Sequence, residues 1–305
     1  MRLHLTGLFL LFVSLASAQQ DAMYTRYMFN ALSINPACAG SRDALSVTVL
    51  HRSQWVGFDG APMTQTLTLQ SPVGSDAVNL GFSVINDRIG PVRSTAFFAD
   101  YAFRITLGGA NRLSFGLKAG LNNYHFNLSD LAANNANDPL LGGNESSTSP
   151  NFGVGVYFSG NAFFAGLSVP RILMQDYAYS VGDNQVSREK RHYYLMAGSS
   201  FLLTEKIRLM PSGLIKVTEA APVQADLTAD FLFYERFSIG AAYRSGDAWS
   251  TLAGVYILEN LTLGYSFDWS QTNTTARYNS GTHEIVLRYD YQRKDRKRIR
   301  SPRYF

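Results

Sequence analysis

Apolar and polar residues alternate along residues 113–122. Leucine, phenylalanine and alanine occupy the odd positions from Leu113 to Leu121, whereas serine, glycine, lysine and asparagine occupy the even positions from Ser114 to Asn122. A period of two is typical of a β-strand, because successive side chains point to opposite faces. A strand of about 9–11 residues also crosses a bilayer when it is tilted. Since this alternation recurs along most of the chain, it indicates an outer-membrane β-barrel.

Alternation and turn residues together predict about 14 antiparallel strands, an even number as single-chain bacterial barrels prefer. They lie near 44–51, 64–71, 78–86, 94–105, 112–123, 151–158, 162–169, 191–203, 207–217, 223–233, 237–244, 249–257, 261–270 and 282–291. The fold class is therefore all-β, with a transmembrane barrel over residues 44–291. Residues 19–43 precede it as an N-terminal periplasmic or plug segment.

The links between the predicted strands differ in length. Tight turns fall at 72–77, 106–111, 159–161, 204–206, 234–236 and 258–260. Longer links alternate with them at 52–63, 87–93, 124–150, 170–190 and 271–281, although two links in that set, near 219 and 246, are short. Outer-membrane barrels have short periplasmic turns and longer outer loops. The pattern predicts that both termini face the periplasm.

Charged residues in the predicted strands fall on the polar phase. Asp100 and Arg104, for example, alternate with Tyr101 and Phe103. The same separation holds at Arg208, Lys216, Asp226, Asp230, Arg244, Asp268, Glu284, Arg288 and Asp290. A charge on the lipid face at mid-bilayer costs about 2–4 kcal/mol, so these side chains should face the lumen. Their mixture of signs favours pairing across the interior over an open pore.

A soluble β-sandwich is the alternative architecture, since its strands also alternate. Sandwich strands usually run about 5–6 residues, which is shorter than the strands predicted here. Aromatic residues near the strand ends also fit the girdle of a membrane barrel. They are Trp249, Tyr265, Phe267, Trp269, Tyr289 and Tyr291. Both observations favour the barrel.

Residues 1–18 have the features of a signal peptide. Arg2 precedes an apolar run over residues 8–15, and Ala16-Ser17-Ala18 has the small residues that a signal peptidase cuts. The mature chain should begin at Gln19. The only cysteine, Cys38, does not follow the cut, so a lipid anchor is not expected. The protein is expected to be exported to the outer membrane.

The formal net charge of +4 is unevenly distributed. Residues 292–305 carry seven basic side chains and one acidic side chain, with Arg296, Lys297 and Arg298 in the densest run. A basic run is also a feature of nucleic-acid binding, but an exported chain does not meet nucleic acid. We expect a basic periplasmic tail that is either solvated or bound to an acidic partner.

The residues give no indication of catalysis, a metal or a cofactor. The five histidines are scattered, with no paired metal-ligand spacing. No nucleophile elbow occurs among the many serines. Gly153-Val154-Gly155 lies inside a predicted strand, so these glycines should face the lumen and do not form a phosphate loop. An enzyme is not expected.

Two segments are more specific than barrel formation requires. The first covers residues 27–41, and the second covers residues 51–66, centred on Trp55. Together with residues 84–91 and the closing residues 301–305, they closely resemble the PorP/SprF family. Members of that family are outer-membrane components of the Bacteroidetes type IX secretion and gliding machinery. The resemblance covers nearly the whole mature chain, in order. One departure is at Cys38, where the family more often has an aromatic residue.

The resemblance implies a non-enzymatic membrane subunit. Its partners would be periplasmic ring proteins of the secretion system or a secreted adhesin or other passenger, besides outer-membrane lipid. The candidate partner-binding residues are Tyr27, Phe29, Arg52, Trp55, Phe58, Asp59, Arg296, Lys297 and Arg298. The four from Arg52 to Asp59 are expected in the first outer loop, where Trp55 either anchors a partner or folds into the barrel mouth. The N-terminal segment either contacts a partner or plugs the barrel.

A different class of function is a substrate-specific porin or hydrophobic-solute transporter. It predicts ion conductance and a loop within residues 128–150 that folds inward and constricts the lumen. A secretion subunit predicts co-purifying partners and little conductance. The sequence leaves both functions open.

Overall fold

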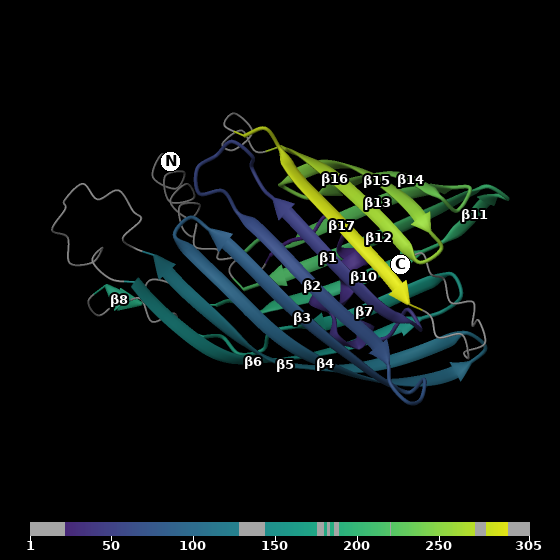
Figure 1. Ribbon diagram of the computed structural model, residues 1–305, viewed down its shortest axis with the longest axis horizontal. Helices are drawn as coiled ribbons and strands as arrows, with labels where there is room; N and C mark the ends of the chain where they lie inside the picture. Colours follow the sequence, from purple (N-terminus) through teal and green to yellow (C-terminus); the bar gives the residue numbers. More distant parts are fainter. Residues whose placement is uncertain are drawn as a thin grey trace, which may run out of the picture.

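The chain folds into a closed antiparallel β-barrel, seen in a computed structural model that describes residues 22–127, 144–175, 180–181, 184–185, 189–219, 221–271 and 279–291 (Figure 1). The main sheet has 15 strands, because one crossing is divided at Ser200 into two strands. The barrel therefore has 14 crossings, which confirms the predicted fold class. It closes where β1 pairs with β17.

The strands of the first half are β1 (Leu45–Ser53), β2 (Met63–Pro72), β3 (Val78–Ile89), β4 (Val92–Gly108), β5 (Asn111–Asn127), β6 (Asn144–Ser159) and β7 (Phe163–Val169). Those of the second half are β10 (His192–Ser199), β11 (Phe201–Thr204), β12 (Ile207–Thr218), β13 (Gln224–Phe233), β14 (Phe237–Arg244), β15 (Ala248–Leu258), β16 (Leu261–Ser270) and β17 (Thr282–Tyr291). A separate small sheet pairs β8 (Ser180–Val181) with β9 (Asn184–Gln185). We call the end of the barrel that holds the link between β1 and β2 the long-loop end, and the opposite end the short-turn end.

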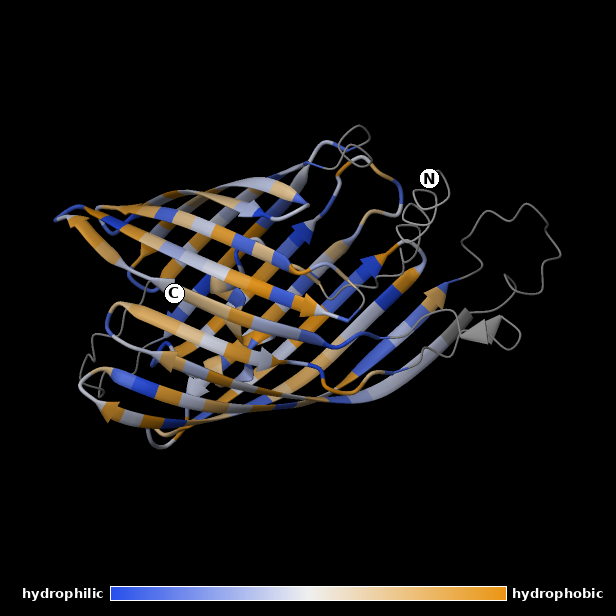
Figure 2. Ribbon diagram, turned by 180° about the vertical axis from the view of Figure 1, so that it is seen from behind, coloured by the Kyte–Doolittle hydropathy of each residue, from blue (hydrophilic) through white to orange (hydrophobic). Residues whose placement is uncertain are grey.

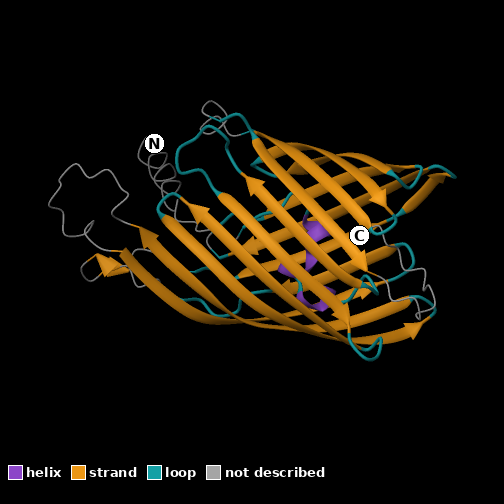
Figure 3. Cartoon of the chain, viewed as in Figure 1, coloured by secondary structure: helices purple, strands orange, loops and turns teal. Residues whose placement is uncertain are grey.

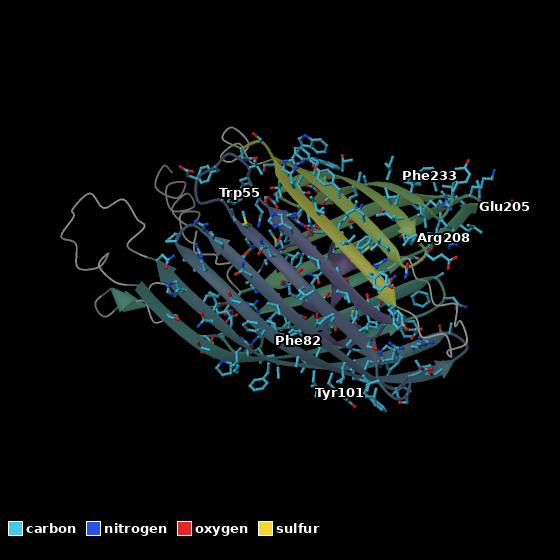
Figure 4. The ribbon with its side chains drawn as sticks, viewed as in Figure 1. Trp55, Phe82, Tyr101, Glu205, Arg208 and Phe233 are labelled. Carbon is cyan, nitrogen blue, oxygen red and sulfur yellow. The ribbon has the colours of Figure 1, made fainter. Side chains whose placement is uncertain are left out.

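Side chains alternate between the outer surface and the lumen along every long strand. On β5, Leu117 is 60% exposed, whereas its neighbour Lys118 is 2% exposed. Figure 2 shows the resulting alternation of hydrophobic and hydrophilic residues along the strands, and Figure 4 shows Phe82 and Tyr101 on the outside of the barrel. Closure leaves no unpaired strand edge, and the outward apolar side chains suit a lipid environment.

The aromatic residues predicted for a girdle lie on the outer surface. Trp249 and Trp269 are each more than half exposed, and they oppose each other on β15 and β16. Trp249 also packs against Tyr243, with ring centroids 4.5 Å apart. Aromatic rings at such strand ends sit at the interface between lipid and water.

The segment before β1 runs through the inside of the barrel. It contains three short helices, η2 (Tyr27–Asn30), α2 (Ala31–Ile34) and η3 (Pro36–Cys38), which Figure 3 shows within the ring of strands. We call residues 22–44 the plug. Met23 lines a cavity with Trp55 at the long-loop end, whereas Asp43 pairs with Arg112, beside the turn between β4 and β5 at the short-turn end. The plug therefore crosses the barrel from one end to the other.

Three details differ from the expectations. The predicted link 87–93 is a two-residue turn, because β3 and β4 continue to Ile89 and from Val92. Arg52 is a strand residue that points into the lumen, in phase with Leu50, and does not belong to the first loop. The plug begins at the long-loop end, so residues 22–26 do not lie at the expected short-turn face. Among the described residues, no helix is long and apolar enough to cross a membrane.

Candidate functional site

Five residues bind the plug to the barrel wall near the long-loop end, and we call them the Glu284 cluster: Thr25, Arg26, Arg52, Asp268 and Glu284. The backbone N–H groups of Thr25 and Arg26 donate to the Glu284 carboxylate, at 2.9 and 2.7 Å. Arg52 forms ion pairs with Asp268 at 2.7 Å and with Glu284 at 3.0 Å. The Thr25 hydroxyl donates to Asp268 at 2.7 Å and accepts from Arg52 at 2.8 Å. Because all five residues are buried, these charges stabilise one another away from water.

The Arg26 side chain reaches the backbone of β15 and β16, next to the strand that carries Glu284. Its Nη2 donates to the Ala253 carbonyl at 2.6 Å, and its Nε donates to the Tyr265 carbonyl at 3.3 Å. Its guanidinium also lies 5.1 Å from the centroid of the Phe29 ring, and that of Arg288 lies 4.5 Å from the same centroid. Phe29 is therefore held by two cation–π contacts inside the lumen.

The middle of the plug bonds to β5, β6 and β7. Lys118 Nζ donates to the carbonyls of Leu32 and Ser33 at 3.1 and 3.4 Å, and it lies 3.4 Å from the Asp100 carboxylate. The Asn35 side chain donates to the Val156 carbonyl at 3.0 Å. The bonds from Lys118 satisfy backbone carbonyls that the single turn of α2 leaves without an intrahelical partner.

Asp43 anchors the plug at the short-turn end. Its carboxylate forms ion pairs with Arg104 at 2.7 Å and with Arg112 at 2.6 Å. Close by in the chain, Arg42 pairs with Asp290 on β17 at 2.9 Å. These acids and bases of the lumen therefore pair with each other or with the plug, as their mixture in the strands indicates.

Glycines on the lumen face make room for the plug. A Cβ atom added at Gly116 would lie 2.1 Å from the Ala37 nitrogen, and one at Gly155 would lie 2.0 Å from the Asn35 side-chain oxygen. Gly155 faces the lumen between outward-facing valines, as predicted. The absence of side chains at these wall positions lets the helices of the plug approach the backbone of β5 and β6.

Little space is left beside the plug. Three cavities that border it have volumes of about 30, 20 and 20 Å³. A cavity of that size holds about one water molecule. A larger cavity of about 480 Å³ lies at the long-loop end, where its lining includes Met23, Trp55 and His192. These small volumes show close packing beside the plug, and the larger cavity lies at the mouth.

An ordered loop over residues 54–62 borders the mouth cavity. The Trp55 N–H donates to the Thr282 hydroxyl at 3.1 Å, and Val56 and Gly281 are joined by a backbone hydrogen bond of 2.9 Å. Trp55 has a positive φ of 47°, which is uncommon for a residue other than glycine. These contacts fix the loop against the start of β17, and Figure 4 shows Trp55 at this end of the barrel.

The nine candidate residues lie in different environments. Tyr27, Phe29 and Arg52 are buried in the lumen, where Tyr27 donates to the Ser212 hydroxyl at 2.9 Å. Trp55 is half-buried, whereas Phe58 is 53% exposed and Asp59 is exposed at the tip of the loop. The structure thus brings Trp55, Phe58 and Asp59 together at the mouth. Arg296, Lys297 and Arg298 lie outside the described residues, as do the predicted signal peptide and most of the link before β6.

Cys38 lies in η3, against the barrel wall. It is fully enclosed by the barrel wall and the rest of the plug. A thiol in such a site reacts slowly, because reagents do not reach it. No group of three or more histidine, cysteine, aspartate or glutamate side chains suited to a metal occurs in the described parts of the chain.

A family described as type IX secretion system membrane protein PorP/SprF matches residues 16–289. The chain belongs to this family. The match confirms the resemblance based on the Tyr27 and Trp55 segments. Membership in a family of membrane proteins, together with the closed barrel and its apolar outer surface, places this PorP/SprF protein in the outer membrane.

Three solved outer-membrane proteins that match the chain are distant from it in sequence. The outer membrane protein Omp33 of Acinetobacter baumannii has 12% identity and a TM-score of 0.46, covering 82% of this chain and 99% of its own. A FadL homologue from Pseudomonas aeruginosa has 11% identity and a TM-score of 0.49, covering 86% and 94%. The KdgM porin has 9% identity and a TM-score of 0.39, covering 81% and 100%. No curated protein is significantly similar in sequence.

Several residues that hold the plug were not singled out from the sequence. Thr25, Arg26 and Asn35 carry no local pattern that marks a contact with strands more than 100 residues away. Glycines on the lumen phase of β5 and β6 could have indicated the plug from the sequence. They leave space inside the barrel that small barrels otherwise fill with side chains.

Proposed function

We propose that this PorP/SprF protein is a non-enzymatic docking subunit of the type IX secretion and gliding machinery. In this function the barrel anchors partners in the outer membrane and does not carry them through its lumen. The plug is the observation that carries the proposal, since it crosses the barrel and is bonded to the wall at both ends and in the middle.

The anchoring of the plug argues against a conduit. To clear the lumen, the chain would have to break the ion pairs of Arg52 and Asp43 and the bonds between Lys118 and α2. Breaking one buried ion pair by removal of a partner typically costs about 3–5 kcal/mol. The same anchoring weighs against the porin or transporter alternative, which requires an open path.

Partner contact is then left to the two ends of the barrel. Outer-membrane barrels place long loops outside the cell and short turns in the periplasm. We therefore assign the loop with Trp55, Phe58 and Asp59 to a secreted passenger or adhesin. Aromatic and charged side chains often carry the binding energy of a protein interface. A loop that is already fixed by backbone hydrogen bonds loses little conformational entropy when a partner binds.

The basic C-terminal residues are assigned to a periplasmic partner. β17 ends at Tyr291, at the short-turn end, and residues 292–305 follow it. Seven basic side chains within these 14 residues would attract an acidic surface on a periplasmic ring protein of the secretion system.

Affinity purification from the native outer membrane tests both assignments. The full chain is compared with a chain lacking residues 292–305 and with the variant Phe58→Ala/Asp59→Asn. We expect the truncation to lose periplasmic ring proteins and the loop variant to lose a secreted protein. The matched control is Arg236→Gln, at an exposed position in a short turn.

The same samples distinguish docking from conduction. The wild-type protein should show little ion conductance in planar bilayers, because its lumen is filled. Heat-modifiability on a gel verifies that each variant has assembled its barrel. Unchanged partner recovery from both variants, or steady conductance from the wild type, would contradict the proposal.

A further inference from the structure

Two arginines are exceptional among the strand residues whose side chains the structure describes. Arg88 on β3 and Arg93 on β4 are the only lysine or arginine side chains on the outward faces of these barrel strands, and no aspartate or glutamate shares those faces. Both side chains are exposed. Asp87 and Val92, their neighbours in the chain, line the mouth cavity, so alternation directs Arg88 and Arg93 away from the lumen.

Strand pairing places the two arginines side by side. Arg88 lies directly opposite Arg93, and Arg93 lies directly opposite His125 on β5. We call these three residues the basic rim. Neighbouring strands are about 4.8 Å apart, and like charges directly opposite each other are destabilising. The described residues offer neither arginine a carboxylate partner, in contrast to the paired bases of the lumen such as Arg52 and Arg104.

The basic rim follows the edge of the apolar outer surface. Val84, Phe97 and Leu121 oppose one another in one outward row. The next outward row toward the long-loop end holds Asn86, Thr95 and Asn123, and the row after it is the basic rim. The Thr95 hydroxyl donates to the Asn86 side chain at 3.2 Å, and the Asn123 side chain donates to Thr148 at 2.7 Å.

The spacing matches the depth of lipid headgroups. Four residues separate Val84 from Arg88, which is about 13 Å along a strand and about 10 Å along the membrane normal at a tilt of about 40°. The headgroup layer extends about 5–8 Å beyond the hydrocarbon on each side. The basic rim therefore lies where phosphate groups lie when the apolar row contacts acyl chains.

We propose that the basic rim binds the phosphate groups of an anionic lipid in the leaflet at the long-loop end. A guanidinium binds phosphate oxygens through two parallel hydrogen bonds, and two opposed guanidinium groups can hold one phosphate or two adjacent phosphates. Asn86 and Asn123 supply amide groups beneath them, and the row of Phe97 contacts the lipid chains. The bound phosphate removes the repulsion between Arg88 and Arg93. This inference concerns the lipid-facing wall and does not depend on the proposed docking function.

Lipid retention by the purified full-length protein tests the proposal. The protein is titrated with diphosphorylated lipid A, with its monophosphorylated form, or with phosphatidylcholine, and the bound lipid is counted by native mass spectrometry. The variant Arg88→Gln/Arg93→Gln is compared with wild type and with Arg236→Gln, which removes an exposed arginine in a short turn. Heat-modifiability checks the assembly of every variant.

We expect the wild type and Arg236→Gln to retain diphosphorylated lipid A, and the double variant to bind it at least about tenfold more weakly. The variant Arg88→Lys/Arg93→Lys should retain part of the affinity, because it keeps the charge and loses the bidentate geometry. Equal retention of diphosphorylated lipid A by wild type and by the double glutamine variant would overturn the proposal. Retention of phosphatidylcholine by the wild type as strong as its retention of lipid A would overturn it too.

Two further arms separate the lipid from other anions. Inorganic phosphate at the same concentration should not displace the bound lipid, because it lacks the chains that contact the apolar row. Displacement by inorganic phosphate would overturn the assignment to lipid. A second outcome would also overturn the assignment to lipid. In it, the wild type recovers an acidic protein that the double glutamine variant loses, while both retain the same amount of lipid.

Discussion

Arg52 is the single residue on which the long-loop end of the plug most depends. It pairs with both Asp268 and Glu284, and it donates to the Thr25 hydroxyl. Its burial means that solvent does not weaken these interactions. Arg52 therefore serves the Trp55 segment by binding the plug inside the barrel, and not by contacting a partner in the loop.

Replacing Arg52 by methionine should destabilise the barrel. The substitution leaves the carboxylates of Asp268 and Glu284 buried without their cation, which typically costs about 3–5 kcal/mol. Urea unfolding in lipid vesicles measures the change, and Arg52→Lys should lose less because it keeps the charge. Arg236→Met is the matched control, since Arg236 is exposed and should change the unfolding free energy by less than about 0.5 kcal/mol. Equal losses at Arg52 and Arg236 would show that the Glu284 cluster does not hold the plug.

Cys38 offers a chemical readout of the plug, because it is the only cysteine of the chain. Its thiol is enclosed by the barrel wall, so a labelling reagent does not reach it while the plug is in place. Labelling by a maleimide should be on the order of a hundredfold slower in the folded protein than after denaturation. Phe58→Cys in a Cys38→Ala background is the accessible control, since Phe58 is exposed. Rapid labelling of folded wild type would mean that the plug leaves the lumen readily.

The strands were predictable because alternation is a local property of each crossing. Lipid selects apolar side chains on one face, and the filled lumen tolerates polar ones on the other. The prediction failed at the link 87–93, where β3 and β4 continue beyond the apolar band. Outside that band lipid no longer selects apolar outward residues, so Arg88 and Arg93 resemble loop residues although their strands are still paired.

The path of the plug was not predictable in the same way. Its anchoring contacts join residues as far apart as Thr25 and Glu284, which are 259 positions apart in the chain. No local pattern marks such a contact. The exposed tip at Phe58 and Asp59 followed from the turn residues around it, whereas the burial of Tyr27 and Phe29 became visible only in the assembled barrel.

The seating of η3 against β5 and β6 should be sensitive to a single methyl group. A Cβ at Gly155 would lie 2.0 Å from the Asn35 side chain, so Gly155→Ala should displace the plug and lower the unfolding free energy by about 1–3 kcal/mol. Gly213→Ala is the matched control, because Gly213 faces outward and its nearest neighbour would be Leu227 at 3.4 Å. Faster maleimide labelling of Cys38 in Gly155→Ala alone would identify the plug as the part that moves. Indistinguishable behaviour of the two variants would contradict the close packing of η3.

The whole molecule combines an outer surface made for lipid with an interior that one segment of its own chain occupies. A barrel of this circumference would otherwise enclose space between that of small, side-chain-filled barrels and that of 16-stranded porins with a water channel. Here the space holds 23 residues of the plug, and the polar wall that would line a channel binds them instead. The polarity of the lumen therefore does not by itself indicate transport.

Deletion of residues 22–43 should convert the closed barrel into a conducting one. The strands retain their full ladder of hydrogen bonds, and the lumen side chains freed from the plug, such as Lys118 and Glu284, become solvated by water that enters. Planar bilayers should show discrete conductance steps for the deletion variant and little conductance for the full chain. Heat-modifiability must first show that the deletion variant assembles. If it does not assemble, Glu284→Gln, which weakens the bonds to Thr25 and Arg26, should raise the frequency of brief openings instead. An assembled deletion variant that remains silent would mean that other parts of the chain close the lumen, and the plug would then be a structural core and not a barrier.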